Sequence, residues 1–302
     1  MNLIKPSVEI LEQGPGLQGI YDMIELCGKT SYKSPVKGGE EAKKFVDARI
    51  NEGHLAVLEF GTVYLAIPIT THYSGDVCVY QNSPNYCRVT ESSGFRFTDI
   101  FGDKVDCWCV TTNLRFIQEN DLWNDVLEFL CEPTEFHVKR YCARFITDRG
   151  VSHELVRHRT MSFCQESTRY CNYSKDKFDN QVTFIIPSWE TNSEEEVNVF
   201  LPLVLAKAQL TEEGKKKFPF YWGLHIAANS YLKMLESGYT PQEARQVLPN
   251  ALKTEICMCG FEDAWRHFFD LRYRGTTGKP HPDMLNVATM LHDKFEAKGI
   301  SL

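Results

Sequence analysis

The sequence predicts a fold of the α/β or α+β class with a mixed sheet, and three observations support this. Of the 302 residues, 43% are hydrophobic and 24% are charged, which is typical of a folded domain with a large core. Strand-like and amphipathic helical segments are interleaved irregularly along the chain. No internal repeat or low-complexity tract divides it. Length alone allows one or two domains, and we expect one core that carries an insertion.

The first part of the chain is expected to contain two helices and a strand. The spacing of apolar residues predicts helices at 17–27 and 40–51, and Gly53 ends the second helix. The run 57–67 is rich in β-branched and aromatic residues, and Pro68 follows it. We therefore predict a strand there that ends at the proline.

Residues 70–134 differ in character and form the predicted insertion. Short strands are expected at 77–80 and 105–111, separated by turn signals, and a helix is expected at 113–131. A long strand is then predicted at 135–147.

After this strand, Ser152 is the expected cap of a short helix that carries Glu154, Arg157 and His158. Thr240, Pro241 and Glu243 form a predicted capping box, with Arg245 just inside its helix. The remaining predicted elements are a strand at 181–186 and helices at 194–210, 218–237, 261–272 and 283–298.

The net charge of the chain limits the kinds of partner that it can bind. The formal net charge is -7, so we expect neither nucleic acid nor a membrane surface as a partner, and any basic site must be local. The amino terminus lacks the apolar core of a signal peptide, and no apolar run of about 18 residues is present. We expect a cytoplasmic protein.

The eleven cysteines are expected to be reduced thiols, because their number is odd and no secretion signal precedes them. Cys107 with Cys109 and Cys257 with Cys259 are close pairs that could bind a metal or lie buried as thiols. Their C-x-C spacing is shorter than the usual spacing of zinc ligands, so we favour buried thiols and no metal.

The densest chemical signal is the segment RHRTMSFCQESTRY at residues 157–170. Arginine is permanently charged and presents a planar fork of donors that suits phosphates, carboxylates and heterocycle edges. These arginines could instead form solvated ion pairs with Glu154 and Glu166, which would stabilise the fold little. For the whole cluster, which is rich in small polar donors, we favour an anionic-ligand site.

This segment resembles a known family. Arg157-His158-Arg159, seven residues and then Ser167, followed by Thr168-Arg169-Tyr170, is similar to the signature of flavin-dependent thymidylate synthases. The resemblance covers about 14–67 and 135–290 in segments. Its other matching positions are Ser31, Gly53-His54 with Glu59, Ala244-Arg245 before Val247-Leu248-Pro249, and Phe269-Asp270-Leu271-Arg272.

The chain departs from the family pattern at several positions. Phe60 stands where many members have a second histidine, Glu154 where many have glutamine, and Gln165 where many have glutamate. Others have Asn, Arg and Asn near the flavin where this chain has Phe261, Asp263 and His267. These departures concern individual flavin and nucleotide contacts rather than the set of arginines.

The resemblance implies a methyltransferase that converts dUMP to dTMP, with methylenetetrahydrofolate as carbon donor, FAD as hydride carrier and NADPH as final reductant. It implies a single domain over residues 1–302 with an insertion at about 70–134, built on a central, mostly antiparallel mixed sheet flanked by helices. It also implies a homotetramer whose active sites are shared between subunits.

The resemblance assigns the expected site residues. Ser167 and Arg272 are the expected catalytic residues, and Arg272 faces the uracil edge, where it stabilises a developing anion. The expected dUMP-binding residues are Glu154, Arg157, Gln165, Ser167, Arg169, Tyr170, Arg245 and Arg272. The expected FAD-binding residues are Ser31, His54, Glu59, Arg157, His158, Arg159 and His267.

Several alternatives remain. His54 could be a satisfied histidine at a helix end rather than a cofactor contact. Cys164 and Cys171 are interpreted as packing residues, since no cysteine matches an activated nucleophile. Tyr170, Tyr173 and Tyr221 can be ordinary core or interface aromatics. As a whole, the chain could be a non-catalytic nucleotide-binding or regulatory module, or an RNA-binding protein, which its acidic balance disfavours.

Overall fold

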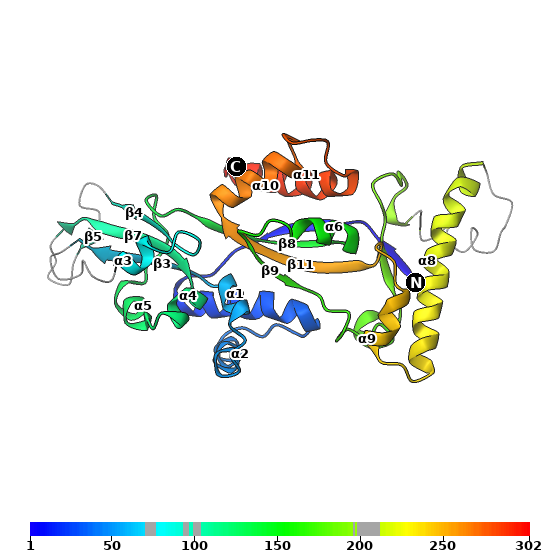
Figure 1. Ribbon diagram of the computed structural model, residues 1–302, viewed down its shortest axis with the longest axis horizontal. Coiled ribbons are helices and arrows are strands. Elements are labelled where there is room, and N and C mark those ends of the chain that lie inside the picture. Colours follow the sequence, from blue (N-terminus) through cyan, green and yellow to red (C-terminus); the bar gives the residue numbers. More distant parts are fainter. Residues whose placement is uncertain (70–76, 93–96, 99–103, 196, 198–211) are drawn as a thin grey trace.

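The elements of the protein are arranged along one long axis (Figure 1). The computed structural model describes residues 1–69, 77–92, 97–98, 104–195, 197 and 212–302. A central sheet has α1 (Gly16–Lys29) and α2 (Glu40–Asn51) on one side and α10 (Glu262–Arg272) and α11 (Pro282–Ala297) on the other. Strands of residues 62–113 extend towards one end of the molecule, and α8 (Glu212–Glu236) lies at the other end.

The central sheet has four strands in the order β2, β8, β11, β9, and all neighbours are antiparallel. Their bounds are Ser7–Leu11 (β2), Arg140–Asp148 (β8), Lys253–Phe261 (β11) and Ser162–Gln165 (β9). β8 and β11 pair along their whole lengths. The arrangement confirms the α+β class and the mostly antiparallel sheet flanked by helices. The predicted strand at 135–147 begins later than expected, at Arg140.

Sequence patterns did not predict β11, which is the strand between β8 and β9. Eight of its nine residues are buried, so the strand lacks the alternation of apolar and polar residues that marks a half-exposed strand. β2 and β9 were also not predicted. These two are short, with five and four residues.

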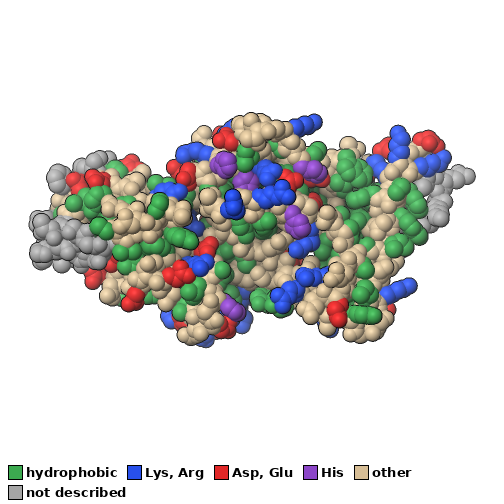
Figure 2. Space-filling model, viewed as in Figure 1, with side chains coloured by type: hydrophobic (Ala, Val, Ile, Leu, Met, Phe, Trp, Pro, Cys, Tyr) green, Lys and Arg blue, Asp and Glu red, His purple; other side chains and the backbone are tan. Residues whose placement is uncertain are grey.

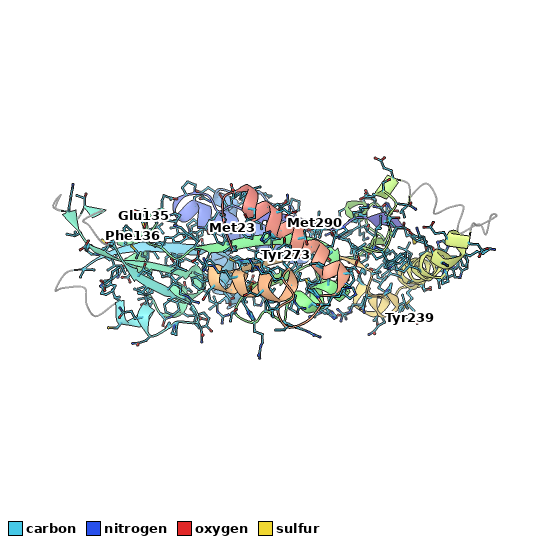
Figure 3. All side chains as sticks on the ribbon, turned by 90° about the horizontal axis from the view of Figure 1, so that it is seen from above. Met23, Glu135, Phe136, Tyr239, Tyr273 and Met290 are labelled. Carbon is cyan, nitrogen blue, oxygen red and sulfur yellow. The ribbon has the colours of Figure 1, made fainter. Side chains whose placement is uncertain are left out.

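Apolar side chains pack on both faces of this sheet. On one face, Trp265, Phe268 and Phe269 of α10 and Phe295 of α11 are buried in one core cluster. The other face carries a smaller cluster, in which Met23 and Cys27 of α1 meet Phe60 and three strand cysteines, Cys142, Cys257 and Cys259. In Figure 3, Tyr273 and Met290 lie at the middle of the molecule, over α10 and α11, and Tyr239 lies near the end.

The described part of the 70–134 segment continues a second sheet. Its strands are β3 (Thr62–Pro68), β7 (Cys107–Asn113) and β4 (Arg88–Glu91), all antiparallel, with a separate pair β5 (Phe97–Thr98) and β6 (Lys104–Val105). The predicted strand at 77–80 is wrong, because these residues form the helix α3 (Val77–Gln81). The predicted helix at 113–131 is two helices, α4 (Leu114–Glu119) and α5 (Trp123–Phe129).

Two local features determine where α4 begins and why it does not continue into α5. The Asn113 side chain accepts a hydrogen bond from the Phe116 backbone N–H at 3.1 Å and so caps α4. Asp121 has a φ of 56°, a left-handed conformation that cannot continue a helix. The start of β3 also differs from prediction, since residues Leu55–Phe60 form the 3-10 helix η2 rather than part of the strand.

The third region surrounds α8. β1 (Asn2–Ile4) and β10 (Thr183–Ile185) form a separate parallel pair, and α9 (Pro241–Ala244) packs beside α8. The capping box of Thr240 and Glu243 is confirmed, and Gly238, with a φ of 91°, follows α8. Arg245 was predicted to lie just inside this helix, but α9 ends at Ala244 and Arg245 begins the 3-10 helix η4 (Arg245–Val247). Most of the predicted helix at 194–210 lies outside the described residues. Within the described residues, no helix is long and apolar enough to span a membrane.

Candidate active site

The arginine-rich segment follows the short helix α6 (Arg149–Leu155). Its cap is Asp148 rather than Ser152, because the Asp148 carboxylate accepts from the Val151 N–H at 2.8 Å. Ser152 is buried inside the first turns and donates to the Arg149 carbonyl at 2.9 Å. The helix ends before Arg157 and His158, so these residues lie in the turn that leads to β9 and not on the helix as predicted.

Arg272, at the end of α10, joins this turn. Its Nη1 donates to Glu154 Oε2 at 2.6 Å, and its Nε donates to His158 Nε2 at 3.2 Å. These partners are 118 and 114 residues away in the sequence. The Arg-His-Arg segment and the later arginine motif are therefore parts of one cluster, formed by Glu154, His158 and Arg272.

His158 is neutral in this cluster. Burial lowers its pKa to about 4, with further lowering by the positive charge of Arg272 and by His267. Since arginine can only donate, His158 Nε2 must accept and the ring proton must lie on Nδ1. The ring also packs edge-on against Phe268 at 5.1 Å, which fixes its orientation.

Arg157 and Arg159 point to different cavities. Arg157 lines a cavity of about 440 Å³ together with Glu154 and Arg272. Arg159 lines another, of about 500 Å³, together with Glu59 and His267. Neither guanidinium forms a hydrogen bond or ion pair with the described part of the chain. Figure 2 shows Lys, Arg and His side chains gathered over the middle of one face.

Glu59 is held in place by two donors. Ser162 Oγ donates to Glu59 Oε2 at 2.5 Å, and Arg115 Nη1 lies 2.6 Å from Oε1. Arg115 belongs to α4, in the 70–134 segment, and it also pairs with Glu119 at 2.8 Å. The predicted insertion therefore reaches a predicted flavin contact, which spacing in the sequence could not indicate.

A third cavity, of about 550 Å³, is lined by Ser31, His54, Phe163 and Cys164 among others. Ser31 Oγ lies 3.1 Å from Cys164 Sγ, and the Ser31 carbonyl accepts from the Ser167 N–H at 3.0 Å. The first matching segment thus contacts the Ser167 loop directly. The His54 side chain is 67% exposed, and its Nδ1 lies 3.4 Å from Glu52 Oε2 beside the end of α2.

The remaining predicted nucleotide contacts lie on or near the Ser167 loop. Arg245 Nη1 donates to Thr168 Oγ1 at 3.2 Å, which brings Arg245 to this loop. Tyr170 is 51% exposed, and the centroid of its ring lies 4.8 Å from that of the Tyr32 ring. Tyr170 is therefore not a core aromatic in the single chain, whereas Tyr173 and Tyr221 are buried.

Two predicted nucleotide contacts remain to be placed. Gln165 is hydrogen-bonded within the chain, and Arg169 is exposed. Gln165 donates its amide to Ser152 Oγ at 2.8 Å and to Thr254 Oγ1 at 3.1 Å. Arg169 is exposed, with its guanidinium 5.3 Å from the Tyr170 ring.

The cysteines near the site are packing residues. Burial raises the pKa of Cys164 and of Cys171 to about 11, which keeps both thiols protonated at neutral pH. All four members of the C-x-C pairs are buried in strands, as free thiols. In the part of the chain that the structure describes, no three His, Cys, Asp or Glu residues are grouped as metal ligands.

Sequence reasoning missed three basic residues at the site: Arg88, Arg115 and Arg140. Arg88 and Arg115 belong to the 70–134 segment, for which no motif was available. Arg140 begins β8 and is buried. The sequence feature that could have revealed it is a charged residue within a predicted strand.

Comparisons with known proteins agree with the sequence pattern. A sequence model of the thymidylate synthase complementing protein family matches residues 133–298. A flavin-dependent thymidylate synthase of Pyrococcus furiosus is 30% identical over 165 residues, which is 54% of this chain and 59% of that protein. Another, of Geobacter sulfurreducens, is 30% identical over 124 residues, which is 41% of this chain and 43% of that protein. The chain spans about half the length of the curated relatives that it matches.

Two solved structures are also similar. The UMP/dUMP methylase PolB of Streptomyces cacaoi, bound with 5-Br UMP, has a TM-score of 0.43 and 14% identity, covering 100% of this chain and 99% of that chain. Thymidylate synthase X of Helicobacter pylori, with FAD and dUMP, has a TM-score of 0.35 and 20% identity, covering 51% of this chain and 66% of that chain.

Proposed function

This chain belongs to the thymidylate synthase complementing protein family, and on that premise we propose that it is a flavin-dependent thymidylate synthase. In the proposed reaction dUMP is reductively methylated to dTMP. Methylenetetrahydrofolate donates the carbon, FAD carries the hydride and NADPH is the final reductant. The chemistry uses no cysteine nucleophile, which agrees with the protonated thiols of Cys164 and Cys171.

The observation that carries the proposal is the cluster of Glu154, His158 and Arg272. Two motifs that match the family at distant points of the chain meet there through hydrogen bonds of 2.6 and 3.2 Å. A permanent cation held by a carboxylate and a neutral imidazole is a preorganised donor. In the proposed role, Arg272 donates to the uracil edge and stabilises the negative charge that develops as the ring is activated.

The side chains present fit a bound flavin. Arg157 and Arg159 are guanidinium groups without partners in the described residues, and each lines a cavity. Such groups favour an anionic ligand, and reduced flavin and its phosphates are anionic. We assign Ser31, His54, Glu59, Arg157, His158, Arg159 and His267 to this cofactor. When bound, FAD supplies hydride transfer.

The nucleotide phosphate is assigned to the Ser167 loop. Ser167, Arg169 and Arg245 offer one hydroxyl and two guanidinium groups, and Arg245 already contacts this loop through Thr168. Tyr170, Arg157, Glu154 and Gln165 complete the proposed dUMP set. The hydroxyl of Ser167 accepts a 3.3 Å hydrogen bond from the Arg169 N–H and so orients the turn.

We further propose a homotetramer with shared active sites. Eight of the proposed residues are divided among three cavities: Ser31 and His54 line one, Glu154, Arg157 and Arg272 line another, and Glu59, Arg159 and His267 line the third. In the proposed tetramer, a second copy of the chain contributes residues to each cavity and so completes each active site.

Flavin binding tests the assignment against the alternative of a non-catalytic nucleotide-binding or regulatory module. The purified protein mixed with FAD should show the visible absorbance of bound flavin, and added dUMP should perturb that spectrum. A protein that binds dUMP but no flavin would be the nucleotide-binding module instead. RNA binding with a steep salt dependence would favour the RNA-binding alternative.

A further inference from the structure

The residue before Ser167 is a buried carboxylate that the proposed function does not use. Glu166 is only 1% exposed. Its backbone N–H donates to the Glu255 carbonyl at 2.8 Å, which continues the pairing of β9 with β11 by one residue beyond Gln165. The Ser167 loop therefore leaves the central sheet directly after Glu166, and the contacts that fix Glu166 also fix the start of this loop.

Two donors hold the Glu166 carboxylate. Lys253 Nζ lies 2.7 Å from Oε2, and the Tyr173 hydroxyl donates to Oε1 at 3.0 Å. The Lys253 side chain is 12% exposed, and Tyr173 is buried. Because Tyr173 follows the Ser167 loop in the chain, its hydrogen bond to Glu166 joins the two ends of that loop.

Lys253 is shared by two carboxylates. Its Nζ also lies 2.9 Å from Glu255 Oε1, and Lys33 forms an ion pair with the same carboxylate. Lys253 and Glu255 are two residues apart in β11, so their side chains point to the same side of the sheet. Glu166, Glu255, Lys253 and Lys33 together form one buried charge network.

The charges of this network balance one another. Burial opposes the charge of Lys253, but the carboxylates of Glu166 and Glu255 outweigh it and raise the pKa of Lys253. Burial likewise opposes the charge of Glu255, but Lys253 and Lys33 outweigh it and lower the pKa of Glu255. Lys253 and Glu255 are therefore ionised at neutral pH.

The network has a stronger effect on geometry than on stability. Well-packed apolar residues can replace a buried ion pair at little cost in stability, whereas charge-assisted hydrogen bonds require a defined arrangement of their groups. The contact between Ser31 and Ser167 lies beside this network. The Ser167 N–H donates to the Ser31 carbonyl at 3.0 Å, and Lys33 follows two residues after Ser31. The network thus holds the chain on both sides of that contact.

We propose that Glu166 and Lys253 are positioning residues for the nucleotide phosphate, and that the buried charge network orients the Ser167 loop so that Ser167 and Arg169 donate to one anion. Glu166 and Lys253 act through the loop and do not touch the ligand. Lys253 also cancels the negative charge of Glu166, which would otherwise repel a phosphate beside it. The inference rests on the proposed function for the assignment of the phosphate to this loop.

The test measures how much the phosphate contributes to binding. Dissociation constants are determined by calorimetry, with FAD present, for dUMP and for deoxyuridine, which differ only in the phosphate. The ratio of the two constants is the phosphate preference. A merely structural change that lowers the amount of folded protein affects both ligands alike and leaves this ratio unchanged. The variants are Glu166→Gln, Lys253→Met, Lys253→Arg and Tyr173→Phe.

A second buried carboxylate provides matched controls. Glu190 is paired with Lys217 Nζ at 2.8 Å and accepts from the Tyr221 hydroxyl at 2.5 Å, so it has the same kinds of partner as Glu166. Glu190 lines none of the three cavities of the proposed site. Glu190→Gln and Tyr221→Phe are therefore the controls.

In the unmodified protein, dUMP should bind more tightly than deoxyuridine. Glu166→Gln and Lys253→Met should each reduce this phosphate preference about tenfold, the effect of losing one hydrogen bond to a charged group. Lys253→Arg should retain part of the preference, because the charge remains. Tyr173→Phe should reduce the preference less than Glu166→Gln, because it removes one hydrogen bond and no charge. Both controls should retain the full preference.

The inference is overturned if the unmodified protein does not distinguish the two ligands, or if the preference persists in Tyr173→Phe and in the folded variants of Glu166 and Lys253. An equal loss in Glu190→Gln would also overturn it. Tyr173→Phe keeps the test valid if the charge variants fail to fold, because it leaves every charge of the network in place.

Formation of dTMP from the complete mixture is measured separately. A phosphate preference that depends on Glu166, without dTMP formation, would leave the positioning role standing and remove the proposed function. Formation of dTMP with an unchanged preference in the variants would overturn the positioning role and leave the proposed function standing.

Discussion

Arg272 connects the later arginine motif to the Arg-His-Arg segment through individual hydrogen bonds. Its contacts to Glu154 and His158 fix a guanidinium beside the cavity that Arg157 lines. We predict that Arg272→Ala lowers kcat by about 10²–10³-fold, the usual effect of removing a donor that stabilises transition-state charge. Flavin affinity should change much less. Steady-state kinetics together with flavin titration measure both effects.

Arg274→Ala is the control for this variant. Arg274 lies two residues further along and forms an ion pair with Asp270 at 3.0 Å, away from that cavity. Its replacement should leave kcat within a factor of about two, because such partly exposed pairs contribute little. Equal turnover in Arg272→Ala and the unmodified protein would refute the role of Arg272.

The neutral His158 predicts a pH dependence of stability. Burial lowers its pKa from 6.5 to about 4. Below pH 6.5 the unfolded chain takes up a proton that the folded protein does not, so the free energy of unfolding falls between pH 6.5 and 4 and is fully retained above 6.5. The loss should reach up to about 3 kcal/mol.

His158→Gln should flatten this part of the profile, as measured by urea denaturation at several pH values. His225→Gln, on the outer helix α8, is the control and should keep the original slope. Identical slopes in His158→Gln and the unmodified protein would show that His158 does not account for the effect.

At the scale of elements, α1 places Ser31 and Tyr32 against the Ser167 loop and depends on a close approach of two backbones. A Cβ added at Gly19 would lie 1.8 Å from the Gly14 carbonyl oxygen. Gly19→Ala should therefore lower the free energy of unfolding by about 2 kcal/mol or more, since the backbone must move.

A second helical glycine gives the opposite expectation. At Gly223 in α8, an added Cβ would meet nothing within 4 Å. Gly223→Ala should raise the free energy of unfolding by about 0.5–1 kcal/mol, because alanine favours the helix. Chemical denaturation of both variants measures the difference, and a Gly19→Ala protein as stable as Gly223→Ala would contradict the packing of α1.

Elements with a clear period or cap were predictable from the sequence. The helices α1, α2, α10 and α11 and the capping box at Thr240 agree closely with their patterns. Two kinds of element were not predictable. β11 is buried on both faces and has no alternation, and the Val77–Gln81 segment is rich in residues that favour strands although it forms a helix.

The same limit applies to the site. The Arg-His-Arg segment could be recognised by its residues, and so could the later arginine motif. Their meeting at Glu154 depends on the antiparallel pairing of β8 with β11, the strands that carry α6 and α10 at their ends. Arg88 reaches the site from β4 of the second sheet and Arg115 from α4, which follows β7, so their contribution depends on how the 70–134 segment folds, which no local pattern encodes.

At the scale of the whole molecule, the proposed residues that line cavities are divided among three separate cavities of one chain. If sites are shared between subunits, Arg272→Ala and Ser167→Ala chains should complement each other when they assemble together. Mixing the two inactive variants under conditions of subunit exchange should restore part of the activity, because some sites then receive both intact residues. Native mass spectrometry checks the exchange. Hybrid tetramers without activity would show that each site is built from one chain.

Release of tritium from dUMP labelled at carbon 5 tests the central claim most directly, because methylation at that carbon must remove its hydrogen. With FAD, NADPH and methylenetetrahydrofolate all present, we predict tritium release and an equal amount of dTMP. Omission of any one component should abolish dTMP formation. A folded protein with bound flavin that forms no dTMP from the complete mixture would contradict the account.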